Sequence, residues 1–534
     1  MRKHISSVLA VICLMACGNL WGQTVFNSEY AYDAYRFSQQ FYEGTARSLA
    51  MGNATVALGG DLGAVITNPA AIGVYRYHEF TITPSITSAS ARTNYLGQST
   101  NDNNTRIGIS NFGYVASFAT GRRNSGLINW NLAVTYNKTN NYTLRMSAAG
   151  RTNQSSWLGS KAQSLNNLAD KNQGIYAPSM DMNYSNDPFY SSNATWNEIL
   201  SWNTSLLDTL PDSPYYYIAA TENINGLDIV TGGDLDQYFM KESIGNTSEA
   251  VINFGGNFSN KLFFGVNLGI TSLYYKYSEV YSERAVNSNQ FDSQFRDFTH
   301  YFNYRTSGTG VNLKAGLIYL PVAGLRLGAS ISTPTWMFLY EEWDEQMTAN
   351  FADGYSQHLS SPLGSYNYRL NTPFRWNIGA AYTFGQLGAI SIDYENVNYS
   401  RMRLAEDSQY ASSYDTFADT NSDIKQSFKS SSILRAGVEF NVSPQFAVRG
   451  GFQHYTSGYK YDDTTVQVGS LGIGYTSKGG FFADLTYQQQ FKNQETFQLY
   501  DDITDYDGSV ITAAPVGTNE YGKWKMLLSV GFRF

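Results

Sequence analysis

The side chains of this sequence whose chemistry is easiest to interpret are three basic ones, Arg435, Arg449 and Lys525. Each lies on the polar side of a stretch whose alternate residues are apolar, as Lys525 does in W-K-M-L-L-S-V-G-F-R-F at the end of the chain. A guanidinium or ammonium group at such a place could bind the carboxylate head group of a ligand. It could equally pair with a carboxylate of the protein, such as Glu439 or Asp484, and we prefer this ion pairing.

Residues for catalysis or metal binding do not form a recognisable pattern. The sequence has no nucleophile elbow, no phosphate-binding loop and no metal-spaced cluster. Acidic loops at 415–423 and 501–507 could bind Ca²⁺ through carboxylate oxygens, but neither matches the spaced loop motif. The histidines downstream of the N-terminal leader are scattered and are read as strand or rim residues: His78, His300, His358 and His454. The sequence therefore predicts a protein that is not an enzyme and needs no cofactor or metal.

The elements that would position the basic residues are strands. Side chains alternate between the two faces of a strand, and in the last eleven residues one face is apolar and aromatic, ending in Phe532 and Phe534. Similar alternation recurs from residue 78 onward and predicts about fourteen strands, the first two at 78–92 and 106–121. The 41 tyrosines and 31 phenylalanines suit aromatic girdles. The terminal aromatic resembles the assembly signal of bacterial outer-membrane barrels and implies recognition by the barrel-assembly machinery.

The connections between these strands alternate between tight turns and longer polar loops. Outer-membrane barrels place short turns on one side and long loops on the other, whereas a secreted β-sandwich, the alternative fold, has no reason to do so. The fold predicted is an all-β, transmembrane antiparallel β-barrel over residues 78–534. Its largest loop, at about 149–245, shows helical spacing at Trp196, Ile199, Leu200, Leu206 and Leu207. These residues either pack as a cap over the barrel mouth or form an apolar groove that first binds a ligand.

The N-terminus is typical of a secretory signal peptide over residues 1–22. An alternative cleavage site before Cys17 would give a lipid-anchored protein. Both cysteines, Cys13 and Cys17, fall inside this leader. The formal net charge of −8 argues against nucleic acid as a partner. These features together predict an integral protein of the outer membrane of a Gram-negative bacterium.

Residues 23–77 are predicted to form a separate plug. The stretch 44–73 is rich in glycine and alanine and almost uncharged, which suits close packing inside a barrel lumen, and Asn68-Pro69 favours a turn. With Asn68-Pro69-Ala70 ahead of the first strand, about fourteen strands and the terminal Phe534, the chain resembles the FadL/OmpP1/TodX outer-membrane transporters, in a Bacteroidete-like form.

The resemblance implies a function and a pathway. It implies an N-terminal hatch in the lumen, with Gly52, Asn68, Pro69 and Ala70 along the substrate path. A long-chain fatty acid or other hydrophobic small molecule would pass from an outer groove to a pocket beside the hatch. It would then leave sideways into the bilayer through a gap caused by a kink in the third strand, at about 125–148. The alternatives are a secretion or assembly subunit that binds protein partners and a general aqueous porin.

Overall fold

The computed structural model describes residues 25–183, 186–211, 213–226, 228–407 and 416–534. The predicted signal peptide and the competing cut at Cys17 lie outside these residues. Fourteen antiparallel spanning strands close into a barrel, as the sequence predicts. Its first seven strands are β1 (Glu79–Tyr95), β2 (Gln98–Ala119), β3 (Leu127–Asn141) continued by β4 (Leu144–Thr152), β9 (Leu235–Phe258), β10 (Leu262–Ala285), β11 (Phe295–Tyr319), and β12 (Leu325–Ser332) continued by β13 (Trp336–Phe351).

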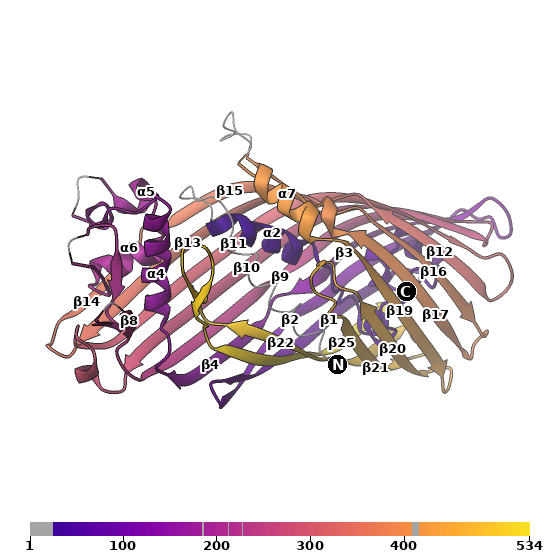
Figure 1. The fold of residues 1–534 in the computed structure, drawn as a ribbon. Coiled ribbons are helices and arrows are strands. Elements are labelled where there is room, and N and C mark those ends of the chain that lie inside the picture. Colours follow the sequence, from indigo (N-terminus) through magenta and orange to yellow (C-terminus); the bar gives the residue numbers. More distant parts are fainter. Residues whose placement is uncertain (1–24, 184–185, 212, 227, 408–415) are drawn as a thin grey trace, which may run out of the picture.

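The second half of the barrel returns the chain to its starting edge (Figure 1). Its strands are β14 (Ser356–Ser360) with β15 (Gly364–Asn371) and β16 (Arg375–Thr383), β17 (Gly388–Asn398) with β18 (Arg403–Glu406), β19 (Ser430–Asn441), β20 (Phe446–Tyr455), β21 (Val466–Thr476), β22 (Phe481–Gln498) and β25 (Val516–Arg533). Closure is made by β1 and β25, which pair Phe80 with Phe532. The backbone N–H of His78 also donates to the carbonyl of Phe534 at 3.0 Å.

The first connection differs from the prediction. Strands β1 and β2 run on to Tyr95 and from Gln98, and they are joined by the two-residue turn Leu96–Gly97, whose φ angles of 48° and 80° are left-handed. Two residues with positive φ form the tight turn that suits the twist of a hairpin. The predicted strands leave a connection at 93–105, but nearly all of these residues belong to β1 and β2 and pair with each other or with the rest of the hairpin.

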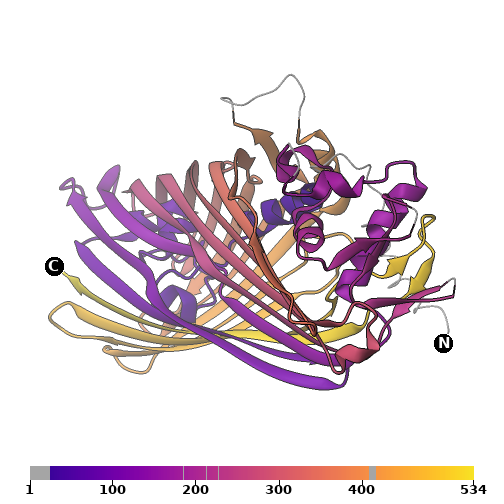
Figure 2. The ribbon, with the colours of Figure 1, turned by 90° about the vertical axis from the view of Figure 1, so that its left-hand side faces the viewer.

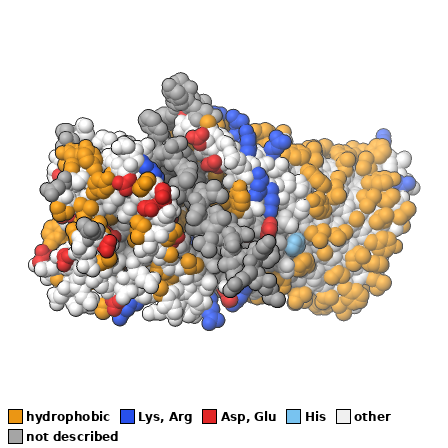
Figure 3. Space-filling view, viewed as in Figure 1, with side chains coloured by type: hydrophobic (Ala, Val, Ile, Leu, Met, Phe, Trp, Pro, Cys, Tyr) orange, Lys and Arg blue, Asp and Glu red, His pale blue; other side chains and the backbone are white. Residues whose placement is uncertain are grey.

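The outer face of the barrel carries a broad apolar band near the end with the short turns (Figure 3). On β10 and β11, outward residues such as Leu268, Ile270, Val311 and Leu313 are each exposed by more than 40%. Aromatic residues such as Tyr274, Trp336 and Tyr340 follow towards the long loops. A continuous belt of exposed aliphatic side chains flanked by aromatics is a lipid-facing surface. Among the described residues, no helix is both long enough and apolar enough to cross a membrane.

The large third connection folds into a cap at one end of the barrel (Figure 1). It contains α4 (Trp157–Asp170), η4 (Ala177–Met180), α5 (Pro188–Ser191), α6 (Trp196–Asn203) and the short strands β5 (Leu207–Thr209), β6 (Tyr217–Ala219), β7 (Glu222–Asn225) and β8 (Asp228–Thr231). The flanking strands run further than predicted, to Thr152 and from Leu235. A second small hairpin, β23 (Ile503–Thr504) and β24 (Val510–Thr512), and the helix α7 (Ala418–Ser427) complete the loops.

Residues 25–77 lie inside the barrel and are called the lumen segment here. They form α2 (Val25–Ser38), α3 (Ala46–Ala50) and two short 3₁₀ helices, η2 (Ala64–Ile66) and η3 (Pro69–Val74). Figure 2 shows this segment enclosed between the walls. Helix α3 contacts β20, β21, β22 and β25, whereas η3 contacts β3, β9, β10 and β11. The segment therefore reaches the wall on opposite sides of the lumen.

Candidate binding site and lateral window

The lumen segment is seated on wall positions that have no side chain. The backbone of the segment comes so close that a Cβ atom would overlap Pro69 at Gly265, Val56 at Gly328 and Met51 at Gly437. At Gly316 a Cβ atom would overlap the side-chain amide of Asn68. A Cβ atom on Gly52, whose φ is 61°, would meet the backbone of Phe452 at 2.8 Å and that of Ala436 at 2.9 Å. Glycine allows a second backbone to approach a strand closely. Sequence reasoning alone does not find these wall glycines, because a strand glycine gives no sign of what packs against it.

Asn68 is the capping residue of η3 and a tie to the wall. Its Oδ1 accepts a hydrogen bond from the N–H of Ala70 at 3.0 Å, as expected of an N-cap. Its Nδ2 donates to the carbonyls of Val56 at 2.6 Å and of Leu317 in β11 at 3.2 Å. Asn68, Pro69 and Ala70 are fully buried in this arrangement. They hold the lumen segment in place and do not line the cavity described below.

Ion pairs engage all three basic candidates. Arg435 contacts Glu395 at 2.7 Å, and Lys525 contacts Glu43 of the lumen segment at 2.9 Å. Arg449 bridges Glu439 at 2.6 Å and a second carboxylate, Asp484, at 2.5 Å. Because Glu439 also binds Arg47 of α3 at 2.9 Å, the same network anchors the lumen segment. Each of the three basic side chains therefore pairs with a carboxylate of the protein, which is the interpretation preferred from the sequence.

A cavity of about 270 Å³ lies between the lumen segment and the wall. One side is made by α2 and the residues after it, and the other by β19 to β22 and β25. Rings dominate the lining: Phe41 lies 4.9 Å from Tyr455 between ring centroids, and Tyr35 lies 4.7 Å from Tyr399. Within the described residues, the Nδ2 atom of Asn493 in this lining is buried without a hydrogen-bond partner. The cavity thus combines aromatic walls with a buried amide group.

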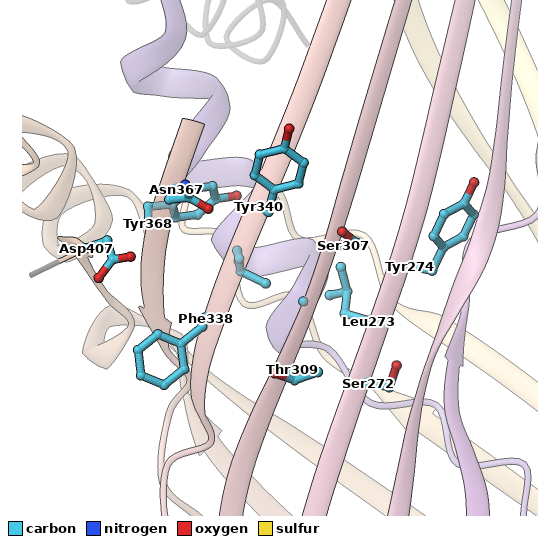
Figure 4. Close-up of a pocket in the computed structure, with 12 residues that line it drawn as sticks. Ser272, Leu273, Tyr274, Ser307, Thr309, Phe338, Tyr340, Asn367, Tyr368 and Asp407 are labelled. Carbon is cyan, nitrogen blue, oxygen red and sulfur yellow. The ribbon is translucent and has the colours of Figure 1, made fainter. Parts of the chain in front are cut away.

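A larger hollow, of about 450 Å³, faces the opposite way (Figure 4). It lies on the outer wall between the exposed rings of Tyr274, Phe338 and Tyr340, over the small residues Ser307 and Thr309. The ladders of β11 with β10 and β13 run unbroken through this region, so the hollow gives no passage. The inner cavity beside the lumen segment is therefore the candidate binding site.

The wall of the barrel is interrupted between β2 and the third strand. Strands β2 and β3 pair from Ala119 with Asn129 up to Asn111 with Asn137, and above that point the described residues of β2 and β3–β4 share no ladder. The third strand breaks after Asn141, and its register with β9 shifts at Lys138–Asn140. Further up, Asp102 accepts hydrogen bonds from the N–H and hydroxyl of Ser147 at 2.8 and 2.6 Å. We call the gap in the ladder between these two points the window; the side chains of Asn104 and Arg106 cross it to Glu242 of β9 at 2.7 and 3.4 Å.

The window opens towards the lipid-facing surface. Ile107 on β2 is 83% exposed, the highest value among the large apolar side chains of the described residues. An unpaired strand edge is unfavourable in hydrocarbon unless it borders protein or a cavity. Here the lumen segment covers part of the free edge: Phe41 N–H donates to the carbonyl of Thr139 at 2.7 Å, and Glu43 N–H to that of Lys138 at 3.1 Å. The resemblance implies a kink in the third strand at about 125–148, and this strand is interrupted after Asn141; exit of a ligand at this point stays a prediction.

The cavity and the window share one wall. The stretch Gln39–Phe41 lines the cavity, and the side chain of Asn140 donates to the carbonyl of Gln39 at 3.2 Å. On the other side, Tyr521 lines the cavity, and two residues along β25 the ammonium of Lys523 donates to the carbonyl of Asn141 at 2.9 Å. These contacts connect residues beside the cavity with the end of β3.

The apolar loop residues have a structural place in the cap. Helix α6 confirms the predicted spacing for Trp196, Ile199 and Leu200, but it ends at Asn203, so the prediction is wrong for Leu206, which follows the helix, and for Leu207, which begins β5. All four aliphatic residues are almost completely buried in the cap core: Ile199, Leu200, Leu206 and Leu207. Trp196 packs against Trp343 of the barrel, with ring centroids 5.6 Å apart. These side chains therefore offer no exposed groove. Among the described residues, no group of three or more His, Cys, Asp or Glu side chains is placed to hold a metal ion.

Comparison with solved structures identifies the fold. The crystal structure of the Pseudomonas putida toluene transporter TodX matches with a TM-score of 0.50 and 12% identity, over 93% of this chain and 100% of TodX. The TodX deltaS2S3 mutant, a monoaromatic hydrocarbon channel, matches with a TM-score of 0.50 and 13% identity, over 92% and 100%. The chain has the TodX fold.

A Pseudomonas aeruginosa FadL homologue also matches this chain, with a TM-score of 0.49, 12% identity and coverage of 93% and 99%. No model of a protein family and no curated protein sequence matches the chain.

Proposed function

We propose that this protein is an outer-membrane channel through which hydrophobic small molecules diffuse from the cell surface into the bilayer. The route leads from the capped end of the barrel to the cavity beside Phe41 and Tyr455, and then sideways through the window. The observation that carries the proposal is the missing ladder between β2 and β3–β4. The fold shared with TodX, a toluene transporter by its description, is consistent with this class of ligand.

The size and lining of the cavity favour a compact ligand. Ligand pockets commonly measure about 300–1,000 Å³, and 270 Å³ lies just below that range. A small aromatic compound fits this volume better than an extended acyl chain. Ten buried carbon groups contribute about 8 kcal/mol, which corresponds to micromolar affinity before the costs of binding. Transport of this kind requires binding and release, and no chemical step.

The lumen segment favours a selective channel over an aqueous porin. It occupies the lumen and is tied to opposite walls through Asn68, Glu43 and Arg47. We propose that it acts as the hatch and that its Phe41–Glu43 part must move away from β3 to free the window. Phe534 is proposed as the signal that the barrel-assembly machinery recognises, since it is 60% exposed at the closing strand.

The test narrows the window without touching the cavity. A Cβ on Gly108 would meet only the flexible end of Lys138, at 3.1 Å, so a large side chain can be accommodated there. Gly108→Trp should slow the transfer of 2-(1-naphthyl)ethanol from the protein to vesicle lipid several-fold, measured by stopped-flow fluorescence, and leave equilibrium binding unchanged. The matched control is Ile109→Trp, which changes the neighbouring residue on the lipid side. Equal transfer rates in both variants would refute release through the window.

A further inference from the structure

Aromatic side chains surround the cavity beside the lumen segment. Seven of the residues that line it carry an aromatic ring, and six of these are tyrosines: Tyr32, Tyr35, Phe41, Tyr399, Tyr455, Tyr459 and Tyr521. They come from α2 and the stretch after it, from β20 and β25, and from the connections that follow β17 and β20. The face of an aromatic ring carries partial negative charge and attracts a cation. A lining of this composition therefore suits a ligand with a positively charged group.

One charged side chain is found among the described residues that line the cavity, and its charge is negative. Asp462 lies between β20 and β21 and is exposed, whereas the rings are buried or partly buried. Its Oδ1 accepts the N–H of Thr464 at 2.8 Å, and no basic side chain of the described part of the chain forms a salt bridge with it. Its charge interacts with the hydroxyl groups of Tyr35 in α2 and Tyr521 in β25, on opposite sides of the cavity. Glu495 of β22 also acts on Tyr521.

The basic side chains near the cavity do not belong to its lining. The guanidinium of Arg375 lies 5.9 Å from the centroid of the Tyr399 ring and pairs with the buried carboxylate of Glu395 at 2.8 Å. Arg435 pairs with the same carboxylate at 2.7 Å. The ammonium of Lys523 on β25 donates to a backbone carbonyl. These cations are thus held by groups of the protein, and Asp462 is the charged group that borders the cavity itself.

We infer that the cavity is a binding site for compact aromatic compounds that carry an ammonium group, and that it selects them over carboxylates of the same shape. The rings hold the aromatic part and attract the ammonium, and Asp462 attracts the positive charge at the rim. Because Asp462 is exposed, salt screens its part of the attraction. The inference rests on the proposed function, since it names the end group of the hydrophobic molecules that would enter this cavity.

The experiment compares three naphthalene compounds that differ in their end group: 2-(1-naphthyl)ethylammonium, 2-(1-naphthyl)ethanol and 1-naphthylacetate. Their affinities for the full-length protein in detergent are measured by fluorescence titration at pH 7 and low salt. For the unaltered protein we expect the ammonium compound to bind at least about fivefold more tightly than the carboxylate. Asp462→Asn keeps an oxygen for the N–H of Thr464 and should lower this ratio at least about threefold, while the neutral alcohol binds equally to both proteins.

The matched control is Asp463→Asn, which removes the next carboxylate along the chain. Asp463 is exposed as well, but it pairs with Lys429 at 3.0 Å and does not line the cavity. This variant should keep the preference of the unaltered protein.

Two results would overturn the inference and leave the proposed function standing, provided that the alcohol binds normally. One is an ammonium-to-carboxylate ratio of about one or less in the unaltered protein, and the other is an unchanged ratio in Asp462→Asn. Failure of the alcohol to bind the unaltered protein would overturn the proposed function, and the inference with it.

Discussion

Gly316 of β11 faces the side-chain amide of Asn68 so closely that any Cβ atom at position 316 would overlap Oδ1. Gly316→Ala should therefore push Asn68 from the wall and weaken its hydrogen bond to the carbonyl of Leu317. Overpacking of this kind typically costs about 1–3 kcal/mol. We expect a lower thermal unfolding temperature in detergent.

The control for this prediction is Gly450→Ala. A Cβ on Gly450 would find its nearest neighbour at an ordinary 3.7 Å, so this variant should be as stable as the unaltered protein. Equal unfolding temperatures for both variants would mean that the close approach at Gly316 does not hold the lumen segment.

Removing the middle of the lumen segment should open the barrel to ions. Deletion of residues 45–72 takes away α3, η2 and most of η3, including the bonds of Asn68 and the ion pair of Arg47. We expect a large rise in single-channel conductance in planar bilayers. Shortening the β23–β24 hairpin, which lies in a loop, should leave conductance unaltered. A barrel that conducts no better after the deletion would show that residues 45–72 are not a plug.

The cap should become less stable as the pH rises. Burial raises the pKa of Glu198 in α6, and this effect outweighs Lys161 and the hydrogen bonds from Thr195, which act in the other direction. The folded cap therefore binds the proton more tightly than the unfolded chain. Stability is present at low pH and falls as the pH rises from the ordinary value of 4.5 through the raised pKa.

The substitution Glu198→Gln keeps an oxygen that accepts the N–H of Thr195 and removes the charge. The variant should resist proteolysis of the cap better than the unaltered protein at pH 8 and equally at pH 5. Asp208→Asn, which changes an exposed carboxylate of the same cap, should follow the unaltered protein at both values. If the Glu198→Gln variant kept the pH dependence of the unaltered protein, this result would contradict a charge buried at this site.

The membrane part of the barrel was predictable from sequence because lipid imposes a strict alternation on it. Rows such as Leu268 and Ile270 are visible without a structure, and the fourteen strands and the cap helix α6 follow from similar patterns. The ends of strands above the bilayer were less visible. Arg92 to Tyr95 pair with Gln98 to Asn101 beyond the apolar belt. Polar residues there do not alternate with apolar ones, so the sequence does not reveal a strand, and the turn at Leu96 was missed.

The candidate site could be predicted only in outline. The basic residues Arg435, Arg449 and Lys525 were found, and their pairing was preferred, but the sequence could not show that Glu395 pairs with Arg435 or that Glu43 pairs with Lys525. A window depends on which backbone positions of two strands pair with each other, and this register cannot be recognised from the residue types. Likewise, the cavity arises from side chains of segments as distant as Phe41 and Tyr455.

The length of β9, β10 and β11 has a consequence for how a compound would enter. These strands have 24, 24 and 25 residues, so at the usual tilt they rise about 55 Å, against an apolar belt about 25 Å tall. The proposed route would carry an oily molecule inside protein past the hydrated, charged layer that coats the cell and hand it over at mid-height. The barrel would then act as a bypass around the permeability barrier, with no pore ever open from one aqueous side to the other.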